Sequence, residues 1–198
     1  MGLFDFLKSK EPSYSDKVWM TKHAALKGMM TEALQSLTQS EVPIVLSFFS
    51  DKQQEVIEFV SANNVPYSVI DANATYGMSM DKTVLLMDAQ WLSSSTRGMD
   101  FISHYSKVSV LNLLFYGHYP VPEKENQLLN KISMTLTNPG QIKFFSSLDD
   151  RAFEMFGAEN VKSIMQKLGL KEEEAIEHAM VTKSMARARE KIAGQVKQ

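Results

Sequence analysis

The chain has 198 residues and a formal net charge of −2, from 21 basic and 23 acidic side chains. This balance argues against the basic stripe of a nucleic-acid-binding domain, so we expect no nucleic-acid partner. The sequence contains no cysteine, which excludes disulfide bonds and thiolate chemistry. With 44% hydrophobic residues, a chain of this length can bury one substantial core.

Residues 1–14 are predicted to form a flexible tail. Leu3, Phe4 and Phe6 would share one face of a helix, with Lys8 and Lys10 behind them. This arrangement permits weak peripheral contact of residues 1–10 with a membrane surface or a partner groove; the alternative is a frayed terminus. The stretch lacks the apolar core of a secretion signal, and the chain has no apolar run of about 18 residues. We therefore expect a cytoplasmic protein without a membrane span.

The next part of the chain alternates between helical and strand patterns. Residues 15–39 place apolar side chains at helical spacing, and a further helix is predicted from Ser50. Short apolar runs separated by helical segments are typical of a parallel sheet with helices on both faces. The predicted strands are residues 42–49, 65–71, 82–87, 108–116 and 142–146.

Two more helices are predicted at the end of the chain, over residues 149–169 and 172–197. The second begins with three glutamates and ends with basic residues, charges that suit a helix dipole. The pattern therefore predicts an α/β domain over residues 15–148 and a C-terminal helical extension over residues 149–198.

The last third of the chain carries strings that no general folding rule demands. They are K-F-F-S-S-L-D-D at residues 143–150, I-E-H-A-M-V-T-K at 176–183 and A-R-E-K at 188–191. These strings resemble R-F-F-x-S-L-E-D, I-E-H-x-x-V-T-K and A-x-x-K in SecA, the ATPase that drives preproteins through the bacterial translocon. They match the end of its second motor domain and the start of its helical scaffold. The resemblance continues more faintly over residues 16–193, where residues 16–22 are similar to the entry strand of that domain, and it implies a RecA-like fold.

The resemblance also indicates which nucleotide-binding features differ. After the strand that matches residues 83–87, SecA has a glycine-rich turn, A-G-R-G-T-D, whereas residues 88–95 contain no glycine. Glycine allows a backbone to approach phosphate closely. The arginine run R-G-R-x-G-R of SecA is matched by residues 129–135, where only Lys131 is cationic, and lysine lacks the planar guanidinium fork. No G-x-x-x-x-G-K-[ST] loop is present either. We therefore expect no cofactor and no ATP hydrolysis by this chain alone.

Two residues favour a catalytic interpretation when each is taken alone. Asp88 follows four apolar residues, as a magnesium-binding aspartate does, but buried parallel strands often end in a polar turn. His118 would suit a general base or a metal ligand, yet its neighbours offer no second ligand at metal spacing. We predict a loop histidine at a strand end, no catalytic residue and no metal site. Asp88 and Lys131 remain weak cofactor-binding candidates.

The leading hypothesis is a non-catalytic protein-interaction module, with protein export implied by the resemblance alone. One alternative is a chain that completes or regulates a partner ATPase in trans, with Lys131 facing the nucleotide. Another alternative is a structural module unrelated to secretion. The expected partner is the translocation machinery or a second copy of the chain.

The candidate interaction face lies on the last predicted helix. We expect this face to pack on its own domain near its start, and to be frayed or engaged with a partner beyond Arg187. A fully docked helix is the alternative. The face consists of Ile176, Met180, Ala186, Ile192 and Val196.

Overall fold

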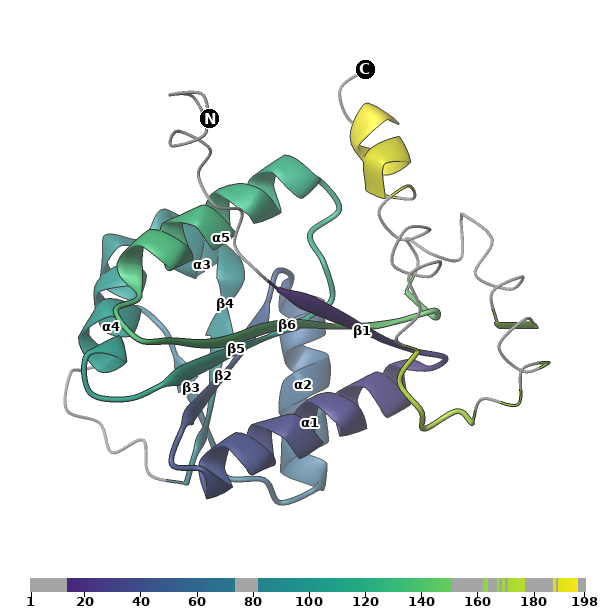
Figure 1. Cartoon of the computed structure of the whole chain (residues 1–198), viewed down its shortest axis with the longest axis horizontal. Coiled ribbons are helices and arrows are strands. Elements are labelled where there is room, and N and C mark those ends of the chain that lie inside the picture. The colour runs from purple at the N-terminus through teal and green to yellow at the C-terminus, as the bar shows by residue number, and fades with distance from the viewer. Residues whose placement is uncertain are drawn as a thin grey trace, which may run out of the picture.

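The structure is a computed structural model of the 198-residue chain (Figure 1). It describes residues 14–73 and 82–150, and in the C-terminal part residues 162, 163, 167, 169, 171–176, 187 and 189–195. The predicted tail contact of residues 1–10, and the candidate residues Met180, Ala186 and Val196, lie outside the described residues. Among the described helices, none is long and apolar enough to cross a membrane.

A six-stranded sheet in which every strand is parallel to its neighbours forms the centre of the described fold. The strand order is β1-β6-β5-β2-β4-β3. The central strands β2 and β5 are buried along their whole length, as near-continuous apolar runs predict. The strands are β1 Ser15–Trp19, β2 Val42–Ser47, β3 Tyr67–Ile70, β4 Val84–Asp88, β5 Leu111–Tyr116 and β6 Pro139–Ser147.

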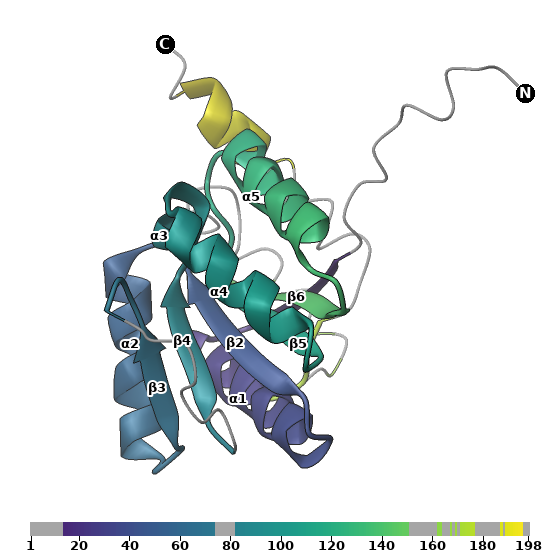
Figure 2. The same ribbon diagram turned by 90° about the vertical axis from the view of Figure 1, so that its left-hand side faces the viewer.

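Helices cover both faces of this sheet (Figure 2). Side chains alternate across a strand, so Ile44 and Leu46 of β2 pack in one core while Val45 between them packs in the other. The first core lies under α3, α4 and α5, and the second lies under α1 and α2. The helices are α1 Lys22–Thr38, α2 Ser50–Ala62, α3 Ala89–Ser94, α4 Thr96–Ser106 and α5 Pro122–Thr135.

This architecture confirms the predicted α/β fold with a parallel sheet between two helical layers. The five predicted strands are present with ends shifted by up to three residues. Residues 15–39 do not form one helix, because residues 15–19 pair with β6 at the edge of the sheet, where the resemblance implied an entry strand over residues 16–22. α1 then starts where Thr21 Oγ1 accepts a hydrogen bond from the Ala24 amide at 3.2 Å.

The C-terminal segment differs from the predicted helix that begins at residue 172. Residues 172–174 form a turn, and Ile176 makes an antiparallel bridge with Val18 of β1. The Ile176 amide donates to the Val18 carbonyl at 2.6 Å, and the Ile176 side chain is 3% exposed. An edge strand such as β1 has unpaired backbone groups. The bridge between Ile176 and Val18 therefore outweighs the helical preference of the glutamates at residues 172–174. The predicted division at residue 148 stays a prediction.

Candidate functional site

The candidate site lies where the connections leave the sheet in opposite directions. β2 continues into α2 on one face, toward β3, whereas β5 continues into α5 on the other face, toward β6 and β1. The carboxyl ends of β2 and β5 are neighbours, so a crevice opens between the two departing chains. Such a switch point is the usual place for a ligand in an open α/β sheet.

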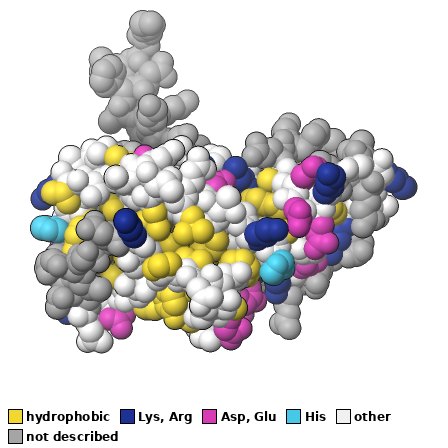
Figure 3. Space-filling model, turned by 90° about the horizontal axis from the view of Figure 1, so that it is seen from below, with side chains coloured by type: hydrophobic (Ala, Val, Ile, Leu, Met, Phe, Trp, Pro, Cys, Tyr) yellow, Lys and Arg dark blue, Asp and Glu magenta, His cyan; other side chains and the backbone are white. Residues whose placement is uncertain are grey.

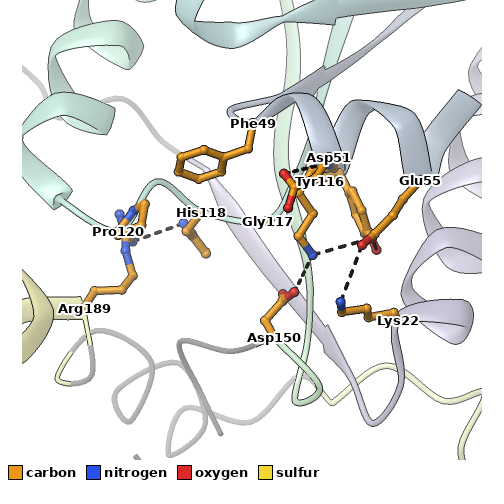
Figure 4. Close-up of a pocket in the computed structure, with 11 residues that line it drawn as sticks. Lys22, Phe49, Asp51, Glu55, Tyr116, Gly117, His118, Pro120, Asp150 and Arg189 are labelled. Carbon is orange, nitrogen blue, oxygen red and sulfur yellow. Dashed lines mark hydrogen bonds and ion pairs between the residues drawn. The ribbon is translucent and has the colours of Figure 1, made fainter. Parts of the chain in front are cut away.

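A pocket of about 420 Å³ occupies this position. Figure 4 shows its lining side chains converging from the carboxyl ends of β1, β2, β5 and β6, with Arg189 entering from the C-terminal helix, which is described over residues 189–195. Gly117 permits the turn after β5, because its φ of +80° is a conformation that side-chain-bearing residues rarely adopt. The lining residues are Lys22, Phe49, Asp51, Lys52, Glu55, Tyr116, Gly117, His118, Pro120, Asp150 and Arg189.

One side of the pocket is a network around Lys52 of α2. Its ammonium forms an ion pair with Asp150, lies 3.8 Å from Glu55 Oε2 and sits 4.5 Å from the centroid of the Tyr116 ring. Lys22 reaches the same Glu55 at 3.5 Å. The network joins the start of α1, the start of α2 and the end of β6, so it fixes three walls of the pocket relative to one another.

Tyr116 is the residue of this network that projects from β5. Its hydroxyl donates to Glu55 Oε2 at 2.8 Å. Burial, the hydrogen bond to Glu55 and the charges of Glu55, Asp150 and Asp149 together raise the pKa of Tyr116. The phenol therefore stays protonated and serves as a hydrogen-bond donor, not as a base.

The opposite side of the pocket is a cluster of four ionisable groups that we name the ion quartet: Asp16, His118, Glu125 and Arg189. His118 Nε2 lies 3.1 Å from Asp16 Oδ1, and His118 Nδ1 lies 3.1 Å from both oxygens of Glu125. Arg189 Nη2 lies 2.6 Å from Glu125 Oε1. The Tyr119 amide also donates to Glu125, at 2.8 Å. The side chains of His118 and Glu125 are 4% and 1% exposed, so this is a buried arrangement.

Burial and charge act in opposite directions on the histidine. Burial alone would lower the pKa of His118, but Asp16 and Glu125 outweigh it, and the net effect raises the pKa. For Glu125, burial would raise the pKa, whereas His118, Arg189 and the Tyr119 amide lower it overall. When His118 is protonated, two cations face two carboxylates in the quartet. Arg189 Nη1 lies 3.1 Å from His118 Nδ1, but a protonated Nδ1 already donates to Glu125 and accepts nothing from the guanidinium.

The sequence placed His118 in a loop after a strand, and the backbone there agrees. Its side chain is nevertheless buried between carboxylates from β1 and α5, two elements that lie far from it in sequence. Asp16, Glu125 and Arg189 were missed as site residues. Within the described ranges, no group of three or more His, Asp or Glu side chains is arranged to hold a metal ion.

The two cofactor-binding candidates lie away from this pocket, on either side of α3. Asp88 Oδ1 accepts the Trp91 amide at 2.7 Å and so caps the start of α3. Lys131 of α5 donates to the Ser93 carbonyl at 2.8 Å, near the end of the same helix. A cation at that end also suits the helix dipole. Both side chains thus stabilise α3, and the structure does not bring them together on one ligand site.

An aromatic pair separates the main pocket from a smaller one. Phe49 and Tyr119 stack with ring centroids 5.6 Å apart and planes 13° from parallel. Phe49 lines the main pocket, and Tyr119 lines a pocket of about 190 Å³ with Gln90 and Lys124. Phe49 is 36% exposed. An aromatic surface therefore lies between the two pockets at the carboxyl ends of the strands.

Comparison with known proteins identifies relatives of the chain. It is 24% identical to the protein translocase subunit SecA of Halothermothrix orenii over 184 residues, which cover 90% of this chain and 22% of that protein. It is 26% identical to the SecA of Desulfovibrio desulfuricans over 191 residues, covering 90% and 21%. A shorter match to the SecA of Pelotomaculum thermopropionicum is 47% identical over 55 residues, or 28% of this chain and 6% of that protein. The chain is related to SecA.

The resemblance to SecA that the sequence motifs indicated is thereby confirmed. The chain spans about a fifth of the length of the SecA proteins it matches. No family model matches the chain. Among solved structures, it is similar to the C-terminal part of the Fun30 ATPase domain, with a TM-score of 0.46 and 9% identity, covering 86% of this chain and 54% of that one.

Proposed function

We propose that the protein is a non-catalytic, SecA-related module that acts in protein translocation through its surfaces. The observation that carries this proposal is the use of Asp88 and Lys131 to stabilise α3. These are the two side chains that the sequence offered for nucleotide binding. A nucleotide that recruited either of them would remove a cap from α3, which costs about 0.5 to 2 kcal/mol for an N-cap.

The charges of the main pocket also support a non-catalytic role. Each of its three Lys and Arg side chains is paired with a carboxylate: Lys22 with Glu55, Lys52 with Asp150 and Arg189 with Glu125. A phosphate group entering the pocket would meet these carboxylates as well as the cations. The pocket therefore lacks the excess of positive charge that phosphate binding requires.

The face formed by α1 and α2 offers a surface for a partner. Figure 3 views this face and shows hydrophobic side chains gathered at its centre, with charged side chains around them. Leu34 of α1 is 40% exposed there. Contiguous apolar surface with a polar rim is typical of interaction sites. The partly buried hydrophobic residues that pack against the core beneath this face are Leu37, Ile57, Phe59, Val65, Tyr67 and Ala175.

The test is binding to a purified SecA translocase, measured by interferometry, together with the ATPase rate of that SecA. We expect saturable binding that Leu34→Asp weakens at least about tenfold, as loss of an interface anchor does. Met134→Asp is the control, because Met134 is 83% exposed on α5, which covers the other face of the sheet. If the protein raises the ATPase rate of SecA and Lys131→Gln abolishes the increase, the result would instead favour the alternative in which the chain completes the active site of a partner ATPase. Absence of binding would contradict the proposal.

A further inference from the structure

The interaction face predicted on the last helix offers little free apolar surface where the structure describes it. Ile176 is 3% exposed and bridges to β1, and Ile192 is half-buried. Arg189 forms a buried ion pair with Glu125, so the expectation of a frayed end beyond Arg187 is wrong at this residue.

The two edges of the sheet differ in how they are protected. β1, at one edge, is bridged by Ile176 and carries the charged side chains of Asp16 and Lys17. β3 forms the opposite edge (Figure 2), and within the described residues no strand pairs with its outer side. Proteins usually protect such an edge with charges, prolines or bulges, because it is a template for pairing with another chain. The β3 sequence, Y-S-V-I, contains neither a charge nor a proline.

The hydrogen bonds between β3 and β4 show which backbone groups face outward. The Val84 amide donates to the Pro66 carbonyl at 2.9 Å, so Pro66 faces β4. Alternate residues of a strand in a parallel pair face opposite sides, so Tyr67 and Val69 turn their N–H and C=O groups outward. Pro66 does not block the outer edge, because its missing N–H belongs to the inner side. Within the described residues, Tyr67 and Val69 therefore present unpaired donors and acceptors to a further strand.

The side chains around this edge are apolar at its centre and oppositely charged at its ends. Val69 is 42% exposed, and on the same face Tyr67 packs against the core under α1 and α2. Asp71 follows β3 at its carboxyl end, and Lys82 precedes β4 at the end where Tyr67 pairs with Val84. Both charged residues are exposed, and neither forms an ion pair with another described residue.

We propose that β3 pairs with β3 of a second copy of the chain, in antiparallel orientation, to form a two-fold symmetric dimer with a continuous sheet. A two-fold axis pairs identical surfaces, so one uncharged strand serves both sides. Antiparallel pairing brings Asp71 of one copy to the Lys82 end of the other, two strand spacings or about 10 Å across the sheet, which the two side chains can span. Parallel pairing would instead place like charges side by side. The dimer rests on the edge of the sheet and not on the proposed role in translocation.

Sedimentation velocity of the full chain tests for the dimer. From about 1 µM to about 0.5 mM, the sedimentation coefficient should rise with concentration, as mass action requires. Val69→Lys should raise the dimer Kd at least about tenfold, because a lysine on an edge strand opposes pairing. Val108→Lys is the matched control, since Val108 is 74% exposed and precedes β5, which β2 and β4 separate from β3. Both variants should keep the Tm of the unmodified chain.

Charge exchange tests the orientation of the two strands. Asp71→Lys and Lys82→Asp should each raise the dimer Kd roughly threefold or more, because each places like charges together at both ends of the paired strands. The double variant restores opposite charges and should return the Kd to within about twofold of the original value. Two single losses that add up in the double variant would contradict the antiparallel arrangement.

Cross-linking gives a second measure of the pairing. The chain has no cysteine, so Val69→Cys introduces a single thiol at the paired edge. A short bismaleimide should link two copies of this variant and not two copies of Val108→Cys; equal or absent linking of the two would contradict the proposal. A dimer that Val69→Lys leaves unchanged, or that Val108→Lys weakens equally, would overturn it. So would a monomer at every concentration, which would leave the edge open to a strand of another protein.

Discussion

His118 lies flat against Phe144, with ring centroids 4.2 Å apart and planes 5° from parallel. The phenyl ring covers one face of the imidazole, whose Nδ1 forms a hydrogen bond with Glu125 and whose Nε2 lies 3.1 Å from Asp16 Oδ1. A strand, a loop and a helix are thus tied together by one side chain. Its protonation state should therefore be measurable in the stability of the whole domain.

The first prediction concerns pH. The pKa of His118 is raised in the folded protein, so its protonation stabilises the fold fully below the unfolded pKa of about 6.5. This stabilisation is lost as the pH rises through the folded pKa. We expect the free energy of unfolding in urea to fall as the pH rises above about 6.5. In His118→Gln this decline should be absent; equal declines in both proteins would show that another group titrates.

At acid pH, the free energy of unfolding depends on Glu125. Its pKa is lowered in the folded protein, so its contribution is present above its ordinary value of 4.5 and is lost as the pH falls through the folded pKa. Acid unfolding and the loss of stability above pH 6.5 are therefore separate transitions. Titration from pH 6.5 upward isolates His118.

The second prediction concerns the buried carboxylate. Glu125→Gln removes the carboxylate partner of the Arg189 guanidinium and leaves His118 beside Asp16 alone. We expect a loss of about 3 to 5 kcal/mol in the free energy of unfolding, the usual cost of breaking a buried charge pair. Glu123→Gln, at an exposed position in the first turn of the same helix, should cost less than about 1 kcal/mol. Similar losses in the two variants would mean that the quartet is not a coupled unit.

The third prediction concerns nucleotide. A ligand at 100 times its Kd stabilises a fold by about 2.7 kcal/mol. For a chain of this size, that corresponds to a rise in Tm of roughly 5 to 10 °C. We expect no such rise with millimolar ATP or ADP and magnesium. A saturable rise that disappears in Asp88→Asn or Lys131→Gln would contradict the non-catalytic proposal directly.

The fourth prediction compares two helical glycines. A Cβ on Gly28 of α1 would lie 2.3 Å from the Trp19 ring, which is buried and stacked on Phe145. A Cβ on Gly194 would meet nothing within 4 Å. Gly28→Ala should destabilise the domain by about 1 to 3 kcal/mol, as overpacking does, and shift the tryptophan fluorescence. Gly194→Ala should slow hydrogen exchange in residues 189–195, because alanine favours the helix by roughly 0.5 to 1 kcal/mol.

The fold was predictable because its central strands are buried on both sides and therefore read as short apolar runs. β2 and β5 illustrate this, with every residue buried. The edge strand β1 was harder to predict from residue patterns. Ser15–Trp19 is only partly buried, and the bridge at Ile176 depends on a strand that lies far away in sequence. Local preference favoured a helix near residue 172, and tertiary pairing prevailed.

The site was predictable only in part. His118 stood out as a histidine at a strand end, but nothing adjacent in sequence revealed its partners. Glu125 looks like an ordinary acidic residue in the first turn of a helix. Arg189 looks like one of several basic residues near a helix end. They meet because β1, β5, α5 and the C-terminal helix converge, and residue spacing along one element carries no information on that convergence.

The position of β1 has a consequence for synthesis on the ribosome. Among the described strands β1 is made first, yet its neighbour in the sheet is β6, the last of them, with Ser15 opposite Lys143. The bridge to Ile176 forms later still. Contacts between such distant segments are slow to form and leave nascent chains exposed. β1 therefore stays without its sheet partner until β6 has left the exit tunnel.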